Sequence, residues 1–181
     1  MKLKIPAILV RPALSTELAC IENMMQFYNY DLSESLPLDF AETGLYAIRP
    51  KAQYWSKPGV APFVIYVDDE LAGFAVVDGE VIQPQSQYNM GYFFIARRHR
   101  GRGVGRLVAS KLFAQFSGAW EVYFYSNNKT ASEFWHAFMA KSSARDVAMS
   151  AQIIDGEPCT LFSFSSGANR VVTVYSPATF F

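Results

Sequence analysis

Hydrophobic residues near the start of the chain recur with the spacing of one helix face. Between residues 14 and 28 they are separated by alternating steps of four and three, which predicts an amphipathic helix capped by Ser15 or Thr16. Residues 5–11 before it predict a strand. Residues 31–60 contain three prolines and two glycines, so we expect a short helix within irregular chain there.

The rest of the chain alternates between strand and helix patterns. Helical stripes are predicted after residue 104 and after Asn128, which can cap the second of them. Asp155-Gly156 separates the last two predicted strands and is typical of a hairpin turn. This order of elements predicts a mixed α/β domain with a twisted central sheet. The predicted strands lie at residues 62–67, 71–77, 88–96, 120–125, 147–154 and 159–164.

Composition narrows the classes of protein that this chain can be. A length of 181 residues suits one domain, and 51% hydrophobic with 18% charged residues excludes global disorder. Sixteen basic and sixteen acidic residues give no net charge, which excludes nucleic-acid binding by bulk charge. Two distant cysteines and two isolated histidines indicate no metal site. We see no targeting signal and no membrane span, and we expect a cytoplasmic protein.

The segment 97–106, RRHRGRGVGR, concentrates positive charge between a predicted strand and a predicted helix. Its three alternate glycines allow a tight turn and let a ligand approach the backbone amides. The first amides of the following helix lack intrahelical acceptors and add a positive dipole end. The segment therefore predicts a cradle for an anion such as a pyrophosphate. A solvated basic turn and a local nucleic-acid contact are the alternatives.

The spacing of the glycines and arginines distinguishes between the known classes of phosphate-binding loop. A phosphate loop of the Walker type needs a lysine followed by serine or threonine, which this segment lacks. A dinucleotide fingerprint would place its third glycine at position 106, which is an arginine. The arrangement Arg100-x-x-Gly103-x-Gly105 instead resembles the acyl-coenzyme A pyrophosphate loop of the GNAT superfamily of N-acetyltransferases.

Two further motifs carry the same resemblance. Phe93-x-Ile95 precedes the loop at the distance that this family keeps, and Asn128-x-x-Ala131-x-x-Phe134-Trp135 is similar to its later helix. The resemblance implies a mostly antiparallel, twisted central sheet flanked by helices over residues 1–167. The β-prone residues 168–181 would be an extension that packs on the same domain or on a second subunit of a homodimer.

The family resemblance also implies a reaction. An amine would attack the thioester of acetyl-coenzyme A directly in a ternary complex, without a metal ion. The acceptor would be a small-molecule amine or a protein amine, with neither nucleic acid nor membrane as a partner. The alternative is a non-catalytic domain of the same fold that binds acyl-coenzyme A. The implied cofactor-binding residues are Phe93, Ile95, Arg100, Gly101, Arg102, Gly103, Val104, Gly105, Arg106, Asn128 and Phe134.

The catalytic groups depart from the family pattern. Tyr92 stands where many relatives have a glutamate base, and Trp135 stands where many have a tyrosine acid. An alkyl amine must lose a proton before it attacks, so a base is needed elsewhere unless Tyr92 serves or activity is lost. Asp31 and Glu34, after the first predicted helix, are the other candidates because that region covers the acceptor site in this family.

Two side-chain environments complete the predictions. His99 lies among the arginines, and we expect it to be a solvated loop residue. Tyr46, Tyr54 and Trp55, in the irregular third of the chain, are expected to line the acceptor pocket.

Overall fold

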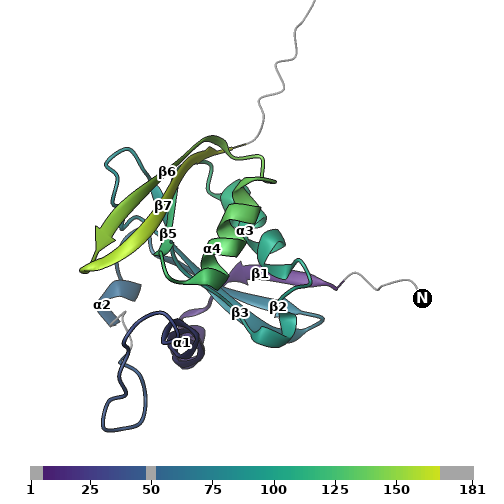
Figure 1. Cartoon of the computed structure of the whole chain (residues 1–181). Coiled ribbons are helices and arrows are strands. Elements are labelled where there is room, and N and C mark those ends of the chain that lie inside the picture. The colour runs from purple at the N-terminus through teal and green to yellow at the C-terminus, as the bar shows by residue number, and fades with distance from the viewer. Residues whose placement is uncertain (1–5, 48–51, 168–181) are drawn as a thin grey trace, which may run out of the picture.

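The computed structural model describes residues 6–47 and 52–167. Across these residues, seven strands form one sheet in the order β1-β2-β3-β4-β5-β7-β6 (Figure 1). The strands are β1 (Ile8–Pro12), β2 (Ala61–Val67), β3 (Glu70–Asp78), β4 (Tyr88–Ile95), β5 (Gly118–Tyr125), β6 (Arg145–Ile154) and β7 (Glu157–Ser166). The helices are α1 (Leu18–Leu32), α2 (Ala52–Trp55), α3 (Val104–Gln115) and α4 (Lys129–Met139), with 3-10 turns η1 (Ser15–Glu17) and η2 (Arg97–His99).

The sheet separates two apolar layers. Buried residues of α3 and α4, such as Leu112 and Trp135, pack on one face together with Trp120 of β5. Ile21 and Met25 of α1 pack on the opposite face, where Tyr54 of α2 joins them. The predicted mixed, mostly antiparallel sheet with flanking helices is confirmed, because only β4 and β5 run parallel among the described strands.

The parallel pair β4–β5 is short, and this interrupts the ladder in the middle of the sheet. Only Tyr88 with Trp120 and Asn89 with Glu121 are paired, whereas β4 continues to Ile95 along β3. Beyond Asn89 the two strands diverge, and the edge of β4 that faces β5 is open. A gap therefore opens between neighbouring strands in the centre of the sheet.

Hairpin turns join the strands on either side of this gap. Asp68 and Asp69 connect β2 to β3 with φ angles of 50° and 66°. Two consecutive residues in the left-handed region are typical of the two-residue turn that matches the twist of a hairpin. The predicted hairpin at Asp155-Gly156 is confirmed by the pairing of β6 with β7.

Three local predictions have different outcomes. Neither Ser15 nor Thr16 caps α1, because both lie in η1 and the residue at the N-cap of α1 is Glu17. The Glu17 carboxylate accepts the Leu14 amide at 2.8 Å and so caps η1. His99 is buried at 3% exposure rather than solvated, because η2 turns it inward. The predicted extension at 168–181 lies outside the described residues.

One charged residue in the interior supports the loop between β3 and β4. Glu121 of β5 is fully buried, and its carboxylate accepts the amides of Ile82 at 2.5 Å and Gln83 at 3.0 Å. A buried carboxylate is stable only when its oxygens are hydrogen-bonded, and these two amides supply the bonds.

In the described part of the chain, no helix is both long and apolar enough to cross a bilayer.

Candidate functional site

The open edge of β4 presents backbone groups to the gap. The amide of Ala96 donates to the carbonyl of Ala72, next to Gly73 in β3, at 2.8 Å. Because backbone groups alternate in direction along a strand, those of Phe93 and Ile95 point away from β3 and toward the gap. The carbonyl of Ile95 is already occupied there by Nε of Arg100, at 2.6 Å. The amides of both residues and the carbonyl of Phe93 are therefore directed at the gap.

The arginine-glycine loop follows β4 and leads directly into α3. Gly101 and Gly103 have φ angles of 70° and 81°, and a Cβ built on either would meet no atom within 4 Å. Gly103 is the residue from which α3 begins, so its left-handed backbone directs the first amides of the helix. Open space over these two residues leaves room for a ligand beside the amides.

The third glycine of the loop has a different role. A Cβ on Gly105 would lie 3.1 Å from the Phe134 ring of α4. Phe134 in turn stacks on Phe93 of β4, with ring centroids 5.7 Å apart. Gly105 therefore permits α3 to approach α4 closely, and Phe134 lies against the strand that borders the gap.

The remaining loop residues divide into exposed and anchored side chains. Arg102 and Arg106 are exposed, whereas Val104 is buried in the core. Arg100 is anchored to the Ile95 carbonyl and to the carboxylate of Asp31. The loop therefore offers two exposed guanidinium groups next to the first amides of α3. Backbone amides, a helix N-terminus and arginines together suit a diphosphate.

The structure does not bring the carboxylates of Asp31 and Glu34 together. Asp31, at the end of α1, accepts Arg97 at 2.6 Å and also binds Arg100, so it ties α1 to the loop. The contact with Asp31 raises the pKa of Arg97. Glu34 lies beyond the end of α1 and is exposed. Neither carboxylate lines the cavity described below.

The helix after β5 begins at Asn128, as the sequence predicts. Its side chain accepts the Ala131 amide at 3.0 Å, so the oxygen that would meet a ligand caps α4 instead. Trp135 is buried among Phe93, Phe113 and Phe138. The indole is part of the core and offers no acid to the gap.

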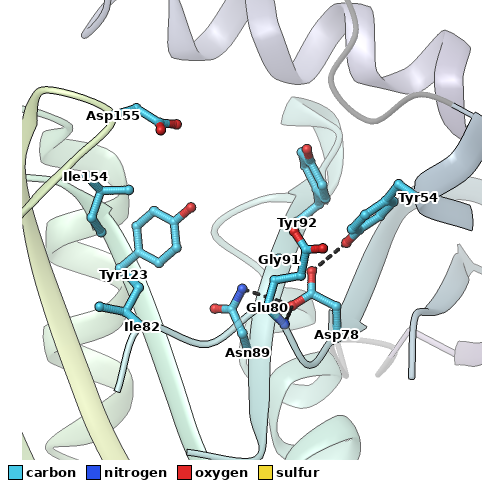
Figure 2. Close-up of a pocket in the computed structure, with 10 residues that line it drawn as sticks. All are labelled: Tyr54, Asp78, Glu80, Ile82, Asn89, Gly91, Tyr92, Tyr123, Ile154 and Asp155. Atoms are coloured by element: carbon cyan, nitrogen blue, oxygen red, sulfur yellow. Dashed lines mark hydrogen bonds between the residues drawn. The ribbon is translucent and has the colours of Figure 1, made fainter. Parts of the chain in front are cut away.

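A cavity of about 260 Å³ lies where β4 and β5 begin to diverge, on the α1/α2 side of the sheet (Figure 2). Side chains from α2, β3, β4, β5 and the β6–β7 hairpin surround it. Of the three aromatic residues predicted to line an acceptor pocket, Tyr54 lines this cavity, and Tyr46 and Trp55 do not. The lining residues are Tyr54, Asp78, Glu80, Ile82, Asn89, Gly91, Tyr92, Tyr123, Ile154 and Asp155.

Asp78, the last residue of β3, lies at the centre of this group with 3% exposure. Its Oδ2 accepts the Tyr54 hydroxyl at 2.5 Å, and its Oδ1 accepts the Glu80 amide at 3.0 Å and Nδ2 of Asn89 at 3.1 Å. The pKa of Asp78 is raised, chiefly by burial and further by the charge of Glu80, although these three donors act to lower it. Such a carboxylate in a cavity is a stronger base than an exposed one and marks a candidate functional site.

Two phenols at the cavity, Tyr54 and Tyr123, have raised pKa values and are neutral at pH 7. Burial raises the pKa of Tyr123 to about 12. Burial, together with the hydrogen bond to Asp78, raises the pKa of Tyr54 well above its usual value. Tyr92 does line the cavity, with its ring packed edge-on against Tyr28 and Tyr54. At neutral pH, Asp78 is therefore better suited than Tyr54 or Tyr123 to accept a proton.

Sequence reasoning missed Asp78 and Asn89. Asp78 precedes Gly79 at the end of a strand, and in sequence this pair is typical of a turn. Asn89 lies within a strand, where a single polar residue has no special meaning. Only the antiparallel register, which pairs these two residues, brings them together.

In the part of the chain that the structure describes, no cluster of His, Cys, Asp and Glu could hold a metal ion.

The sequence of the chain matches a known protein family. The model of the acetyltransferase (GNAT) family matches residues 24–139. No curated protein sequence matches the chain.

Solved structures give similar folds. An acetyltransferase from Thermus thermophilus has a TM-score of 0.60 at 16% identity, over 89% of this chain and 98% of that one. A spermidine N-acetyltransferase from Vibrio cholerae, solved with CoA and spermine, has a TM-score of 0.60 at 11% identity, over 88% and 95%. Nourseothricin acetyltransferase has a TM-score of 0.54 at 18% identity, over 88% and 99%. At these identities the likeness is one of fold.

Proposed function

Because the chain belongs to the GNAT acetyltransferase family, we propose that it transfers the acetyl group of acetyl-coenzyme A to a primary amine by direct attack. The observation that best supports this proposal is the gap between β4 and β5. The anion cradle continues from the end of β4, and the cavity that holds Asp78 lies where the gap begins. Two substrates that bind from different sides of such a gap meet at β4.

The residues present fit acetyl-coenzyme A. The open loop around Gly101 and Gly103, with the first amides of α3, would hold the pyrophosphate. The backbone of Phe93 and Ile95 would pair with the amide-rich pantetheine arm, and Phe134 would pack against it. When bound, acetyl-coenzyme A supplies an activated acetyl group as a thioester.

The chain's own residues would position the carbonyl and exclude water. A backbone amide of β4 that points into the gap is a preorganised donor for an acetyl oxygen, and such donors stabilise the charge that develops during acyl transfer. Asn128 contributes by fixing the start of α4 rather than by a free carboxamide oxygen. With Trp135 in the core, the thiolate would leave without a side-chain acid, which suits a thiol with a pKa of about 8.5.

The acceptor is proposed to be a small cationic amine. The vicinity of the cavity contains the carboxylates of Asp78, Glu80 and Asp155, and Lys57 pairs with Glu80. The structural neighbours include an enzyme named for spermidine and one named for nourseothricin. A protein amine remains the other class, which the cavity's modest volume favours less.

Calorimetry with acetyl-coenzyme A, followed by free-thiol release with a panel of amines, tests this function. The panel contains spermidine, nourseothricin, free amino acids and a short peptide. Saturable binding with amine-dependent thiol release is the expected result. Binding without turnover by any amine would instead favour a non-catalytic acyl-coenzyme A domain, and absence of binding would contradict both.

Replacing Asp31 with asparagine tests whether it acts on the acceptor or only anchors the loop. We expect acetyl-coenzyme A affinity to fall at most about fivefold, because ion pairs near the surface contribute little. The pH dependence of kcat should stay that of the wild type, with Glu34→Gln as the matched control. A lost or shifted acid limb in Asp31→Asn would show that this carboxylate does meet the amine.

A further inference from the structure

We propose that Asp78 and Asn89 form the amine subsite, in which Asn89 orients the substrate ammonium and Asp78 takes its proton. The inference rests on the proposed acetyl transfer and names the base and the charge of the acceptor for that reaction. It is carried by an unpaired acceptor atom, by the placement of Asp78 over Gly91, and by the charges around the cavity.

Asn89 holds an unused hydrogen-bond acceptor inside the cavity wall. The side chain is 3% exposed, and its Oδ1 is one of two buried side-chain polar atoms without a partner among the described residues. Its orientation is defined by the neighbouring carboxylate, because the opposite flip would set Oδ1 against Oδ1 of Asp78. Figure 2 shows this oxygen on the side away from Asp78. A buried acceptor left without a donor is costly, and an N–H of a ligand would satisfy it.

Asp78 occupies the place of a missing side chain on β4. A Cβ on Gly91 would lie 2.2 Å from Oδ2 of Asp78 and 3.0 Å from the Tyr54 hydroxyl. Gly91 follows the last β4–β5 pair closely, so the carboxylate reaches the point at which the gap begins. The absence of a side chain at Gly91 thus lets a carboxylate from the neighbouring strand lie against β4, near the position where the reacting groups would meet.

The groups that face Asp78 come from every element around the cavity. Tyr54 of α2 and Asn89 of β4 donate to it, and Tyr92 of β4 and Tyr123 of β5 line the same space. Asp155 is a further carboxylate of the lining, and the charge of Glu80 is balanced by the ammonium of Lys57. A cation is favoured in this setting. The raised pKa of Asp78 adds to its strength as a base once that cation has entered.

The proton balance of the step is complete with the two substrates alone. One proton of the ammonium goes to Asp78, and the freed electron pair of nitrogen forms the bond to the acetyl carbon. The carbon–sulfur bond breaks, and its electron pair leaves on the thiolate, which takes a second proton from nitrogen. The products are the N-acetyl amide and the free thiol, and Asp78 returns its proton to solvent.

The test is Asp78→Asn, with thiol release measured against pH and spermidine and ethylenediamine as amine probes. We expect kcat to fall about 10²–10⁴-fold while the acetyl-coenzyme A affinity by calorimetry is unchanged. The acid limb of the wild-type profile should disappear, and the residual rate should rise only toward the amine's own pKa of about 10. Asn89→Leu should raise KM for the amine more than it lowers kcat.

Tyr54→Phe gives an independent readout that a merely structural role would not produce. Its hydroxyl lowers the pKa of Asp78, so removing it should move the acid limb to higher pH. A carboxyl-carbon NMR titration of Asp78 should follow the same shift without turnover. A wild-type profile in Asp78→Asn, or an unmoved limb in Tyr54→Phe, overturns the subsite while acetyl-coenzyme A binding stands. Failure of the wild-type chain to bind acetyl-coenzyme A overturns the proposed function and this inference together.

Discussion

Replacing Gly103 with valine is expected to weaken acetyl-coenzyme A binding by roughly 100-fold or more. Gly103 has a φ of 81°, where a β-branched residue is strained, so the backbone must turn to accommodate valine. That turn redirects the amides at the start of α3, which begins at this residue. Losing two charge-assisted hydrogen bonds to a diphosphate costs about 3 kcal/mol, which gives the stated factor.

Gly44→Val is the matched control for this prediction. Gly44 has a φ of 73° and equally open surroundings, but it lies in the loop after α1, away from the cradle. Both variants carry the same kind of backbone strain, so both should lose some thermal stability. Only the Gly103 variant should lose affinity in calorimetry. Equal affinities in the two variants would show that the loop does not hold the ligand.

The fold and the arginine-glycine loop between β4 and α3 could be predicted from the sequence because their signals are local. The strand-loop-helix order around residues 93–116 places three glycines and several arginines in consecutive chain, and the structure keeps that order. Asn128 caps α4 by accepting the amide of Ala131, which is only three residues further along the chain. Local motifs of this kind depend on neighbouring residues, so they can be recognised before any tertiary contact is known.

The cavity around Asp78 could not be predicted because its parts are distant in sequence. Tyr54, Asp78 and Asn89 meet only when α2 packs on the sheet and β3 pairs with β4 in register. Asp31 illustrates the same difficulty, since the sequence made this helix-end carboxylate a candidate for the acceptor site and could not show that it binds Arg97 and Arg100. Exposed and buried carboxylates look alike in sequence, and only burial and partners distinguish a base from an anchor.

Gly91→Ala is expected to reduce amine acetylation about 100-fold while leaving acetyl-coenzyme A affinity intact. The added methyl group would overlap Oδ2 of Asp78, which is buried and held by three hydrogen bonds. The carboxylate must therefore move away from the start of the gap, and a displacement of about 1 Å in a catalytic group has an effect of this size. Overpacking should also lower the free energy of unfolding by about 1–3 kcal/mol.

Gly79→Ala separates the loss of geometry from the general cost of a methyl group near Asp78. Gly79 is the next residue after Asp78, yet outside its two chain neighbours a Cβ there would come no closer than 3.9 Å to any atom, the nearest being the Gln87 carbonyl oxygen. Its thiol-release rate with spermidine should remain close to the wild type. Steady-state kinetics and calorimetry on both variants are the measurement. The two changes are chemically identical, and both glycines neighbour Asp78, Gly91 in space and Gly79 in sequence. A selective loss in Gly91→Ala therefore ties turnover to the position of Asp78, whereas full activity in that variant would place the proton acceptor elsewhere.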